Sequence, residues 1–154
     1  MTTTTEDLKL EIKRVLSAPI DRVFAAWTDA QSLRQFITPG NPGHADVECD
    51  VRVGGKFRID MHGTDGKVFK HTGEYLEVLP PRRLKFTWIS AATNQLPTVV
   101  TIDFKSLGDR TEITLAHDGL DSVKNVEGHT KGWTAILEQQ SAVSSQQSAV
   151  SSQQ

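Results

Sequence analysis

The spacing of hydrophobic and polar positions predicts a strand, two short helices, a run of strands and a final helix. The segment LKLEIKRVL, residues 8–16, alternates apolar and polar side chains, as a half-buried strand does. SAPIDRVFAAWTD and AQSLRQFI change to helical spacing, with Ser17 and Pro19 suited to the start of the first helix and Asp29 to the cap of the second. The prolines and glycines of TPGNPGH then interrupt regular structure.

Residues 45–118 predict about six strands in succession. Asp65-Gly66 and Gly108-Asp109 are dipeptides typical of tight hairpin turns, and Pro80-Pro81 separates two further strands. Short turns between consecutive strands indicate an antiparallel meander. The alternation within each strand indicates that one face of the sheet is buried and the other is hydrated.

The segment 121–140 predicts a long helix with one apolar side. That side carries Val126, His129, Trp133, Ile136 and Leu137, and Gly132 is a weak point within it. A helix with such a stripe needs a sheet face to cover it. The predicted fold class is therefore α+β: a curved antiparallel sheet of about six to seven strands wrapped around a long C-terminal helix, with two short helices after the first strand.

The domain organisation follows from the same pattern. Residues 1–7 form a threonine-rich leader that we expect to be flexible, and residues 8–140 form a single domain. Residues 141–154 are an exact doubling of SAVSSQQ, which predicts either a weak extension of the helix or a disordered end. We assign this repeat no function.

Composition narrows the class of protein. A net charge of −2 gives no reason to expect a nucleic-acid partner, and we find neither a signal peptide nor a membrane-spanning stretch in the 154 residues. The single cysteine, Cys49, fits a reducing compartment. We expect a soluble cytoplasmic domain, taken as a monomer, with no integral membrane association.

The glycine pair in RVGGKF raises the question of a phosphate site. Neither the P-loop spacing nor the dinucleotide-binding spacing is present, and the segment runs into a strand rather than a helix. We therefore interpret Gly54 and Gly55 as a bend or bulge where the sheet curls.

The order of these segments resembles the START-like superfamily (SRPBCC, the birch-pollen-allergen or helix-grip fold). It is most similar to the branch named for homology to the activator of the heat-shock protein 90 ATPase. The matching pieces are SAPIDRVFAAWTD, RVGGKFRIDM with its Asp-Gly turn, TGEYLEVLPPRRLKFTW, TEITLAHDGL and GHTKGW. They cover roughly residues 8 to 140 in the family's order. The resemblance implies a helix-grip fold with a cavity between the sheet and the last helix.

The residues expected to line that cavity are mostly apolar. They are Trp27, Phe36, Phe57, Ile59, Met61, Glu74, Trp88, Ile102, His117 and Trp133. Glu74 depends on the hairpin: a two-residue turn at Asp65-Gly66 brings it inward, whereas a turn one residue longer brings His71 and Tyr75 inward instead. The sequence leaves both registers open.

His117 and Glu74 are the polar exceptions and thus the candidate catalytic or ligand-orienting residues. A buried histidine can move a proton or recognise a polar group, and a buried carboxyl has a raised pKa; a hydrogen-bonded structural histidine and a structural salt bridge are the alternatives. The five histidines include no His-x-x-x-His pair, and one cysteine cannot form a thiolate zinc site. We expect no metal and no cofactor.

Three functions are consistent with these features. The first is binding of a small hydrophobic or aromatic ligand, such as a lipid or a polyketide-like molecule, in the cavity. The second is a cyclase, dehydratase or isomerase that uses the same cavity. The third is a protein–protein or chaperone-associated role, which the family name suggests.

Overall fold

The computed structural model describes residues 8–152, with side chains described for residues 8–144. The predicted leader, residues 1–7, lies outside the described residues.

Seven antiparallel strands form one sheet in the order β1-β7-β6-β5-β4-β3-β2. Their bounds are β1 Leu10–Leu16, β2 Ala45–Cys49, β3 Lys56–His62, β4 Val68–Leu79, β5 Arg83–Ser90, β6 Thr98–Ser106 and β7 Thr111–Asp118. Strands β2 to β7 pair with their neighbours in the sequence, as a meander does, and β1 joins the far side of β7. The predicted α+β helix-grip fold is confirmed.

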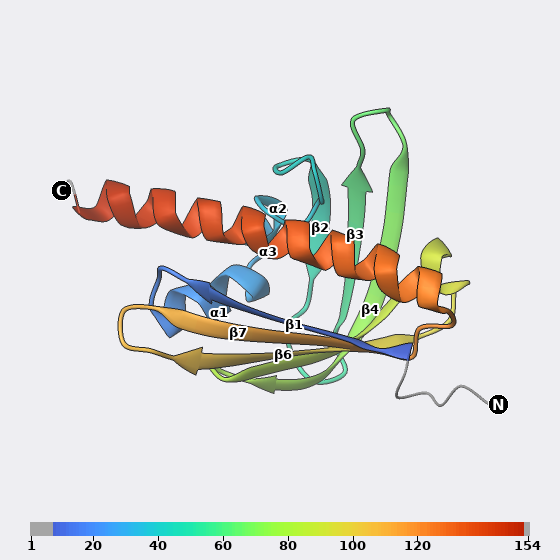
Figure 1. Ribbon diagram of the computed structural model, residues 1–154, viewed down its shortest axis with the longest axis horizontal. Helices are drawn as coiled ribbons and strands as arrows, with labels where there is room; N and C mark the ends of the chain where they lie inside the picture. The colour runs from blue at the N-terminus through green and yellow to red at the C-terminus, as the bar shows by residue number, and fades with distance from the viewer. Residues whose placement is uncertain (1–7, 153–154) are drawn as a thin grey trace.

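The helices are α1 (Ile20–Thr28), α2 (Ala30–Arg34), α3 (Val123–Ser152) and a short 3-10 turn, η2 (Ala91–Thr93). Helix α1 has Pro19, not Ser17, at its N-cap. Asp29 caps α2 as predicted, because its carboxylate accepts a hydrogen bond from the Ser32 N–H at 3.0 Å. Figure 1 shows α3 crossing the face of the curved sheet. Among the described residues, no helix has the length and apolar character needed to span a membrane.

The glycine pair lies in the connection between β2 and β3, rather than at a bulge within a strand. Gly54 has φ of +85°, a conformation that favours glycine, and a Cβ at Gly55 would collide with the Asp50 carbonyl. Two hydrogen bonds hold the pair against β4. The Gly54 N–H donates to the Tyr75 carbonyl, and the Gly55 carbonyl accepts from the Tyr75 N–H, each at 2.9 Å. These glycines shape a tight loop at the end of the sheet.

The register of β3 on β4 settles which side chains of β4 face inward. The strands are joined by residues 63–67, and Ile59 lies opposite His71. This is the register that turns His71 and Tyr75 inward. The placement of Glu74 in the cavity is therefore wrong: its side chain is exposed on the outer face, because a shift of one residue moves every side chain of a strand to the other face.

Two adjacent glutamines fasten α3 to the helical part of the domain. Buried Gln140 accepts a hydrogen bond from Trp27 Nε1 at 2.9 Å. Gln139 donates to the carbonyls of Phe36 and Thr38 at 2.9 and 2.8 Å, and accepts from the Gly40 N–H at 2.8 Å. Residues 139 and 140 therefore anchor the helix, which continues through the first of the two SAVSSQQ repeats and into the second.

We predict that Gln140→Met lowers the free energy of unfolding by about 1–3 kcal/mol, because it leaves the buried Trp27 N–H without its acceptor. Methionine is similar in length and helix propensity, so the amide is the main difference. Chemical denaturation measures the change. Glu138→Met, at an exposed position of the same helix, should stay within about 0.5 kcal/mol of the wild type. Equal stabilities of the two variants would contradict this role of Gln140.

Candidate functional site

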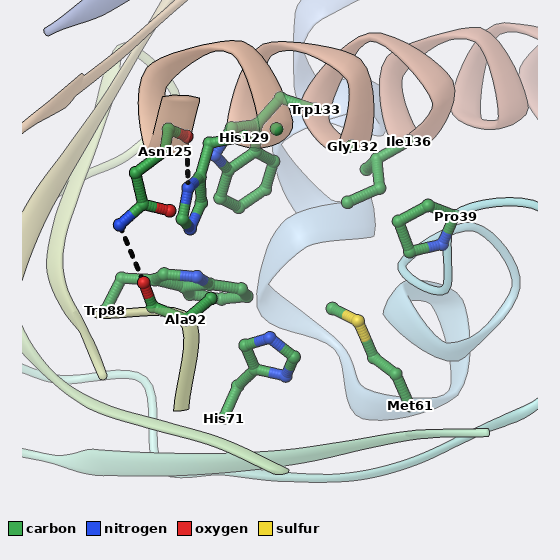
Figure 2. A pocket seen from close by; sticks show the side chains of 11 residues that line it. Pro39, Met61, His71, Trp88, Ala92, Asn125, His129, Gly132, Trp133 and Ile136 are labelled. Atoms are coloured by element: carbon green, nitrogen blue, oxygen red, sulfur yellow. Dashed lines mark hydrogen bonds between the residues drawn. The ribbon is translucent and has the colours of Figure 1, made fainter. Parts of the chain in front are cut away.

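A pocket with a volume of about 290 Å³, called the α3 pocket below, lies between the first half of α3 and the sheet. Figure 2 shows α3 above it and the side chains of the sheet below. Helix α3 contributes Asn125, Gly128, His129, Gly132, Trp133 and Ile136, and the rest of the lining is Pro39, Met61, His71, Trp88 and Ala92. The lining is thus mainly apolar and aromatic, with two histidines and one asparagine.

Two glycines of α3 leave room for this pocket. Gly128 and Gly132 are one helical turn apart on the lining face. A Cβ built on Gly128 would have no other heavy atom within 4 Å, and one on Gly132 would meet only Pro39 Cγ, at 3.9 Å. Neither position is therefore restricted to glycine by close packing. Larger side chains here would extend into open space.

The start of α3 is fixed at one end of the pocket by Asn125. Its Nδ2 donates to the Ala92 carbonyl at 2.7 Å, which ties the helix to η2 (Figure 2). The same nitrogen donates to Asp121 Oδ1 at 2.8 Å. Both hydrogens of the amide group are thereby used. The side-chain oxygen of Asn125 remains as an acceptor.

His117 is fully buried behind the pocket and makes a hydrogen bond with each ring nitrogen. Trp133 Nε1 donates to His117 Nδ1 at 3.0 Å, and His117 Nε2 lies 2.7 Å from the Thr98 hydroxyl. That hydroxyl donates to the Trp88 carbonyl at 2.6 Å. Because Nδ1 accepts, the proton of the neutral ring is on Nε2 and points to Thr98.

The surroundings of His117 favour the neutral ring. Burial, together with the charge of nearby His129, lowers the pKa of His117 to about 3. With both nitrogens engaged, the imidazole has no free atom with which to bind a ligand or exchange a proton. His117 therefore has a structural role: it links α3 to strands β5, β6 and β7.

Two other histidines face the pocket and share one pattern of hydrogen bonding. His71 Nδ1 lies 3.1 Å from the Phe69 carbonyl, and His129 Nδ1 lies 2.9 Å from the Asn125 carbonyl. A carbonyl only accepts, so Nδ1 carries the proton in each neutral ring and Nε2 is the acceptor. Burial lowers the pKa of His71 to about 4, although backbone hydrogen bonds oppose this shift.

The pocket lining has no lysine, arginine, aspartate or glutamate side chain. Within the part of the chain that the structure describes, no three histidine, cysteine, aspartate or glutamate side chains form a group that could hold a metal ion. The residues at the site thus offer hydrogen-bonding groups and aromatic surface, without a carboxylate, ammonium or guanidinium group.

The residues predicted to line one cavity are divided among several places. Met61, Trp88 and Trp133 line the α3 pocket. Trp27, Phe57 and Ile59, with Trp88, surround a void of only about 20 Å³ in the core. Phe36 and Ile102 are buried outside both spaces, His117 lies behind Trp133, and Glu74 is on the outer face.

Reasoning from the sequence missed several lining residues, above all Gly128, Asn125, Pro39 and Ala92. The available signal was the spacing of α3: positions 125, 128, 129, 132, 133 and 136 follow one helical face, and two of them are glycine. A glycine on the apolar side of a helix leaves the space of one side chain empty. Two glycines four residues apart lie on the same side of the helix and therefore predict a pocket beside it. Gly132 was interpreted only as a weak point of the helix.

The family model described as "Activator of Hsp90 ATPase homolog 1-like protein" matches residues 17–143. The chain therefore belongs to this family, within the helix-grip superfamily whose fold it shows. The search of curated proteins found no match.

Solved structures share the fold over most of the chain. Protein CV1439 from Chromobacterium violaceum is 24% identical with a TM-score of 0.78, covering 90% of this chain and 97% of that one. Protein NE0264 from Nitrosomonas europaea is 25% identical with a TM-score of 0.77, covering 93% and 97%. PFC0360w, an HSP90 activator from Plasmodium falciparum, is 26% identical with a TM-score of 0.68, covering 85% and 91%.

We predict that the protein loses stability as the pH falls below about 6.5, the pKa of an unfolded histidine. The pKa values of His71 and His117 are lower in the folded state, so the unfolded chain binds more protons between about pH 6.5 and 4. Each such proton changes the free energy of unfolding by about 1.4 kcal/mol per pH unit. Stability is thus fully present above this window and decreases within it.

Chemical denaturation between about pH 6 and pH 4.5 measures this effect. His71→Gln should flatten the slope of stability against pH by about 1.4 kcal/mol per pH unit. His44→Gln, at an exposed histidine, is the matched control and should keep the slope of the wild type. A wild-type slope in His71→Gln would contradict a buried neutral His71.

Proposed function

We propose that the protein binds a small hydrophobic or aromatic molecule in the pocket between α3 and the sheet. The observation that carries the proposal is the pair of glycines, Gly128 and Gly132, on the lining face of α3. A glycine within a helix is about 1 kcal/mol less favourable than alanine. The space around both Cα atoms is open, so close packing does not explain why these residues are glycines. Keeping the pocket free of side chains does explain it.

The size and surface of the pocket support a small ligand. Its volume of about 290 Å³ is just below the roughly 300–1,000 Å³ of small-molecule sites, which suits a small ligand. Burying roughly 200 Å² of apolar ligand surface contributes about 5 kcal/mol before the costs of association. Polar contacts must supply the rest of a micromolar affinity, which corresponds to about 8 kcal/mol.

The structure gives less support to His117 and Glu74 as the proton-transferring residues of a cyclase, dehydratase or isomerase. Such an enzyme requires a group that transfers a proton to a bound substrate. Both nitrogens of His117 are already hydrogen-bonded, and Glu74 is exposed on the opposite face of the sheet. Ligand binding without catalysis by these two residues is therefore the proposed function.

A chaperone-associated role is a second candidate, favoured by the likeness to the HSP90 activator from Plasmodium falciparum. Capture of a chaperone by the protein, undiminished when the pocket is filled by mutation, would favour this role over ligand binding.

We predict that Gly132→Leu abolishes ligand binding without unfolding the protein. The leucine Cβ would make an ordinary van der Waals contact with Pro39, and the rest of the side chain would occupy the pocket. Replacing glycine also favours the helix. Binding is measured from amide and indole N–H shifts during titration with fatty acids, flavonoids and polyketide-like aromatics.

Lys131→Leu is the matched control, since it adds the same side chain at an exposed neighbouring position outside the pocket. Every compound that binds the wild type should bind this variant with the same dissociation constant. Binding that survives in Gly132→Leu would place the ligand elsewhere. If no compound shifts the wild-type indole resonances, the proposal loses its support.

A further inference from the structure

The indole N–H of Trp88 is a donor that meets the pocket and has no hydrogen-bond partner among the described residues. The other two tryptophans use their N–H groups within the protein: Trp27 donates to Gln140 and Trp133 to His117. Trp88 as a whole is 3% exposed; its Nε1 makes no hydrogen bond to any residue in the range 8–144 but is not fully enclosed, so it remains accessible from the pocket. Figure 2 shows Trp88 lying across the floor of the pocket with its nitrogen on the side of α3. A ligand that fills the pocket would exclude water from this donor, so a ligand atom that accepts a hydrogen bond from it is favoured over one that leaves it unpaired.

Acceptors lie beside this donor. The ring centroids of His71 and Trp88 are 4.7 Å apart, and the His71 ring projects from β4 into the same space (Figure 2). The bond of Nδ1 to the Phe69 carbonyl makes Nε2 the acceptor of the neutral His71 ring, and His129 repeats this arrangement on α3. One N–H donor and imidazole acceptors thus border a single small volume.

We infer that the pocket selects a neutral aromatic hydroxyl compound, whose oxygen accepts a hydrogen bond from Trp88 Nε1–H and donates one to Nε2 of His71 or His129. This inference rests on the proposed function and specifies its ligand. A hydroxyl group matches the site because it is both donor and acceptor. The aromatic part fits the indole surfaces of Trp88 and Trp133, whose ring centroids are 4.9 Å apart.

The same groups disfavour related ligands. An aryl ether can accept from Trp88 but leaves the imidazole acceptor unpaired. A carboxylate cannot donate either, and it would enter a pocket whose lining has no lysine or arginine. Selectivity therefore depends on the type of hydrogen bond, not on the size of the ligand.

Four naphthalene derivatives of nearly equal shape test the inference on the unmodified protein. At about pH 8, where an ordinary imidazole is neutral, 2-naphthol should bind about tenfold more tightly than naphthalene or 2-methoxynaphthalene, and 2-naphthoate more weakly still. Partition into an apolar medium alone would instead favour naphthalene and the ether over the phenol. The Trp88 indole resonance should shift on addition of 2-naphthol.

Two variants assign the effect to the proposed atoms. Trp88→Phe and His71→Phe should each reduce the preference for 2-naphthol over naphthalene severalfold, whatever the affinity of the variant for naphthalene itself. Trp27→Phe, which removes an N–H that already has a partner outside the pocket, should keep the wild-type preference. The ranking of the four probes stands as a test even where a variant fails to fold.

The outcomes separate the two proposals. Equal binding of 2-naphthol, naphthalene and the ether, all lost in Gly132→Leu, would overturn hydroxyl selection and keep the ligand pocket. Tighter binding of 2-naphthoate than of 2-naphthol would also overturn it. If none of the four probes binds the wild type, hydroxyl selection is overturned, and the titration with fatty acids, flavonoids and polyketide-like aromatics decides the ligand pocket separately.

Discussion

The structure depends on the buried hydrogen-bonded series from Trp133 through His117 and Thr98 to the carbonyl of Trp88. It joins the last helix to three strands of the sheet, and the order of donors assigns the His117 proton to Nε2. A charged ring would put a donor on Nδ1 against the Trp133 N–H, so the series requires the neutral form. The low pKa of His117, about 3, agrees with that requirement.

This series also fixes the two tryptophans that bound the pocket. Trp133 comes from above and Trp88 from below, and both are held at atoms that face away from the ligand space. Between them, the two glycines of α3 keep that space open. The pocket thus combines fixed aromatic side chains, Trp88 and Trp133, with two positions that have no side chain, Gly128 and Gly132. The rest of the core is filled. The void deeper in the core, about 20 Å³, shows how complete that filling is.

Much of the fold could be predicted from the sequence because strand alternation, Asp-Gly turns and the Asp29 cap are local signals. The facing of β4 could not, because it depends on one residue of loop length. The loop is closed by the Gly63 N–H on the Lys67 carbonyl at 2.8 Å, a contact that no dipeptide pattern fixes. A loop one residue shorter would turn Glu74 toward the core and His71 outward, whereas the observed loop does the opposite. His117 was predicted to be buried, but its partners come from segments distant in sequence, so its structural role required the structure.

The most direct test of this account is the tautomer of each histidine, measured by two-bond ¹H–¹⁵N correlation in labelled protein at about pH 8, where an ordinary imidazole is neutral. The account predicts the ring proton on Nε2 in His117 and on Nδ1 in His71 and His129. His117 with its proton on Nδ1, or exchanging between tautomers, would contradict the link between α3 and the sheet. His71 with its proton on Nε2 would replace the acceptor in the pocket with a donor.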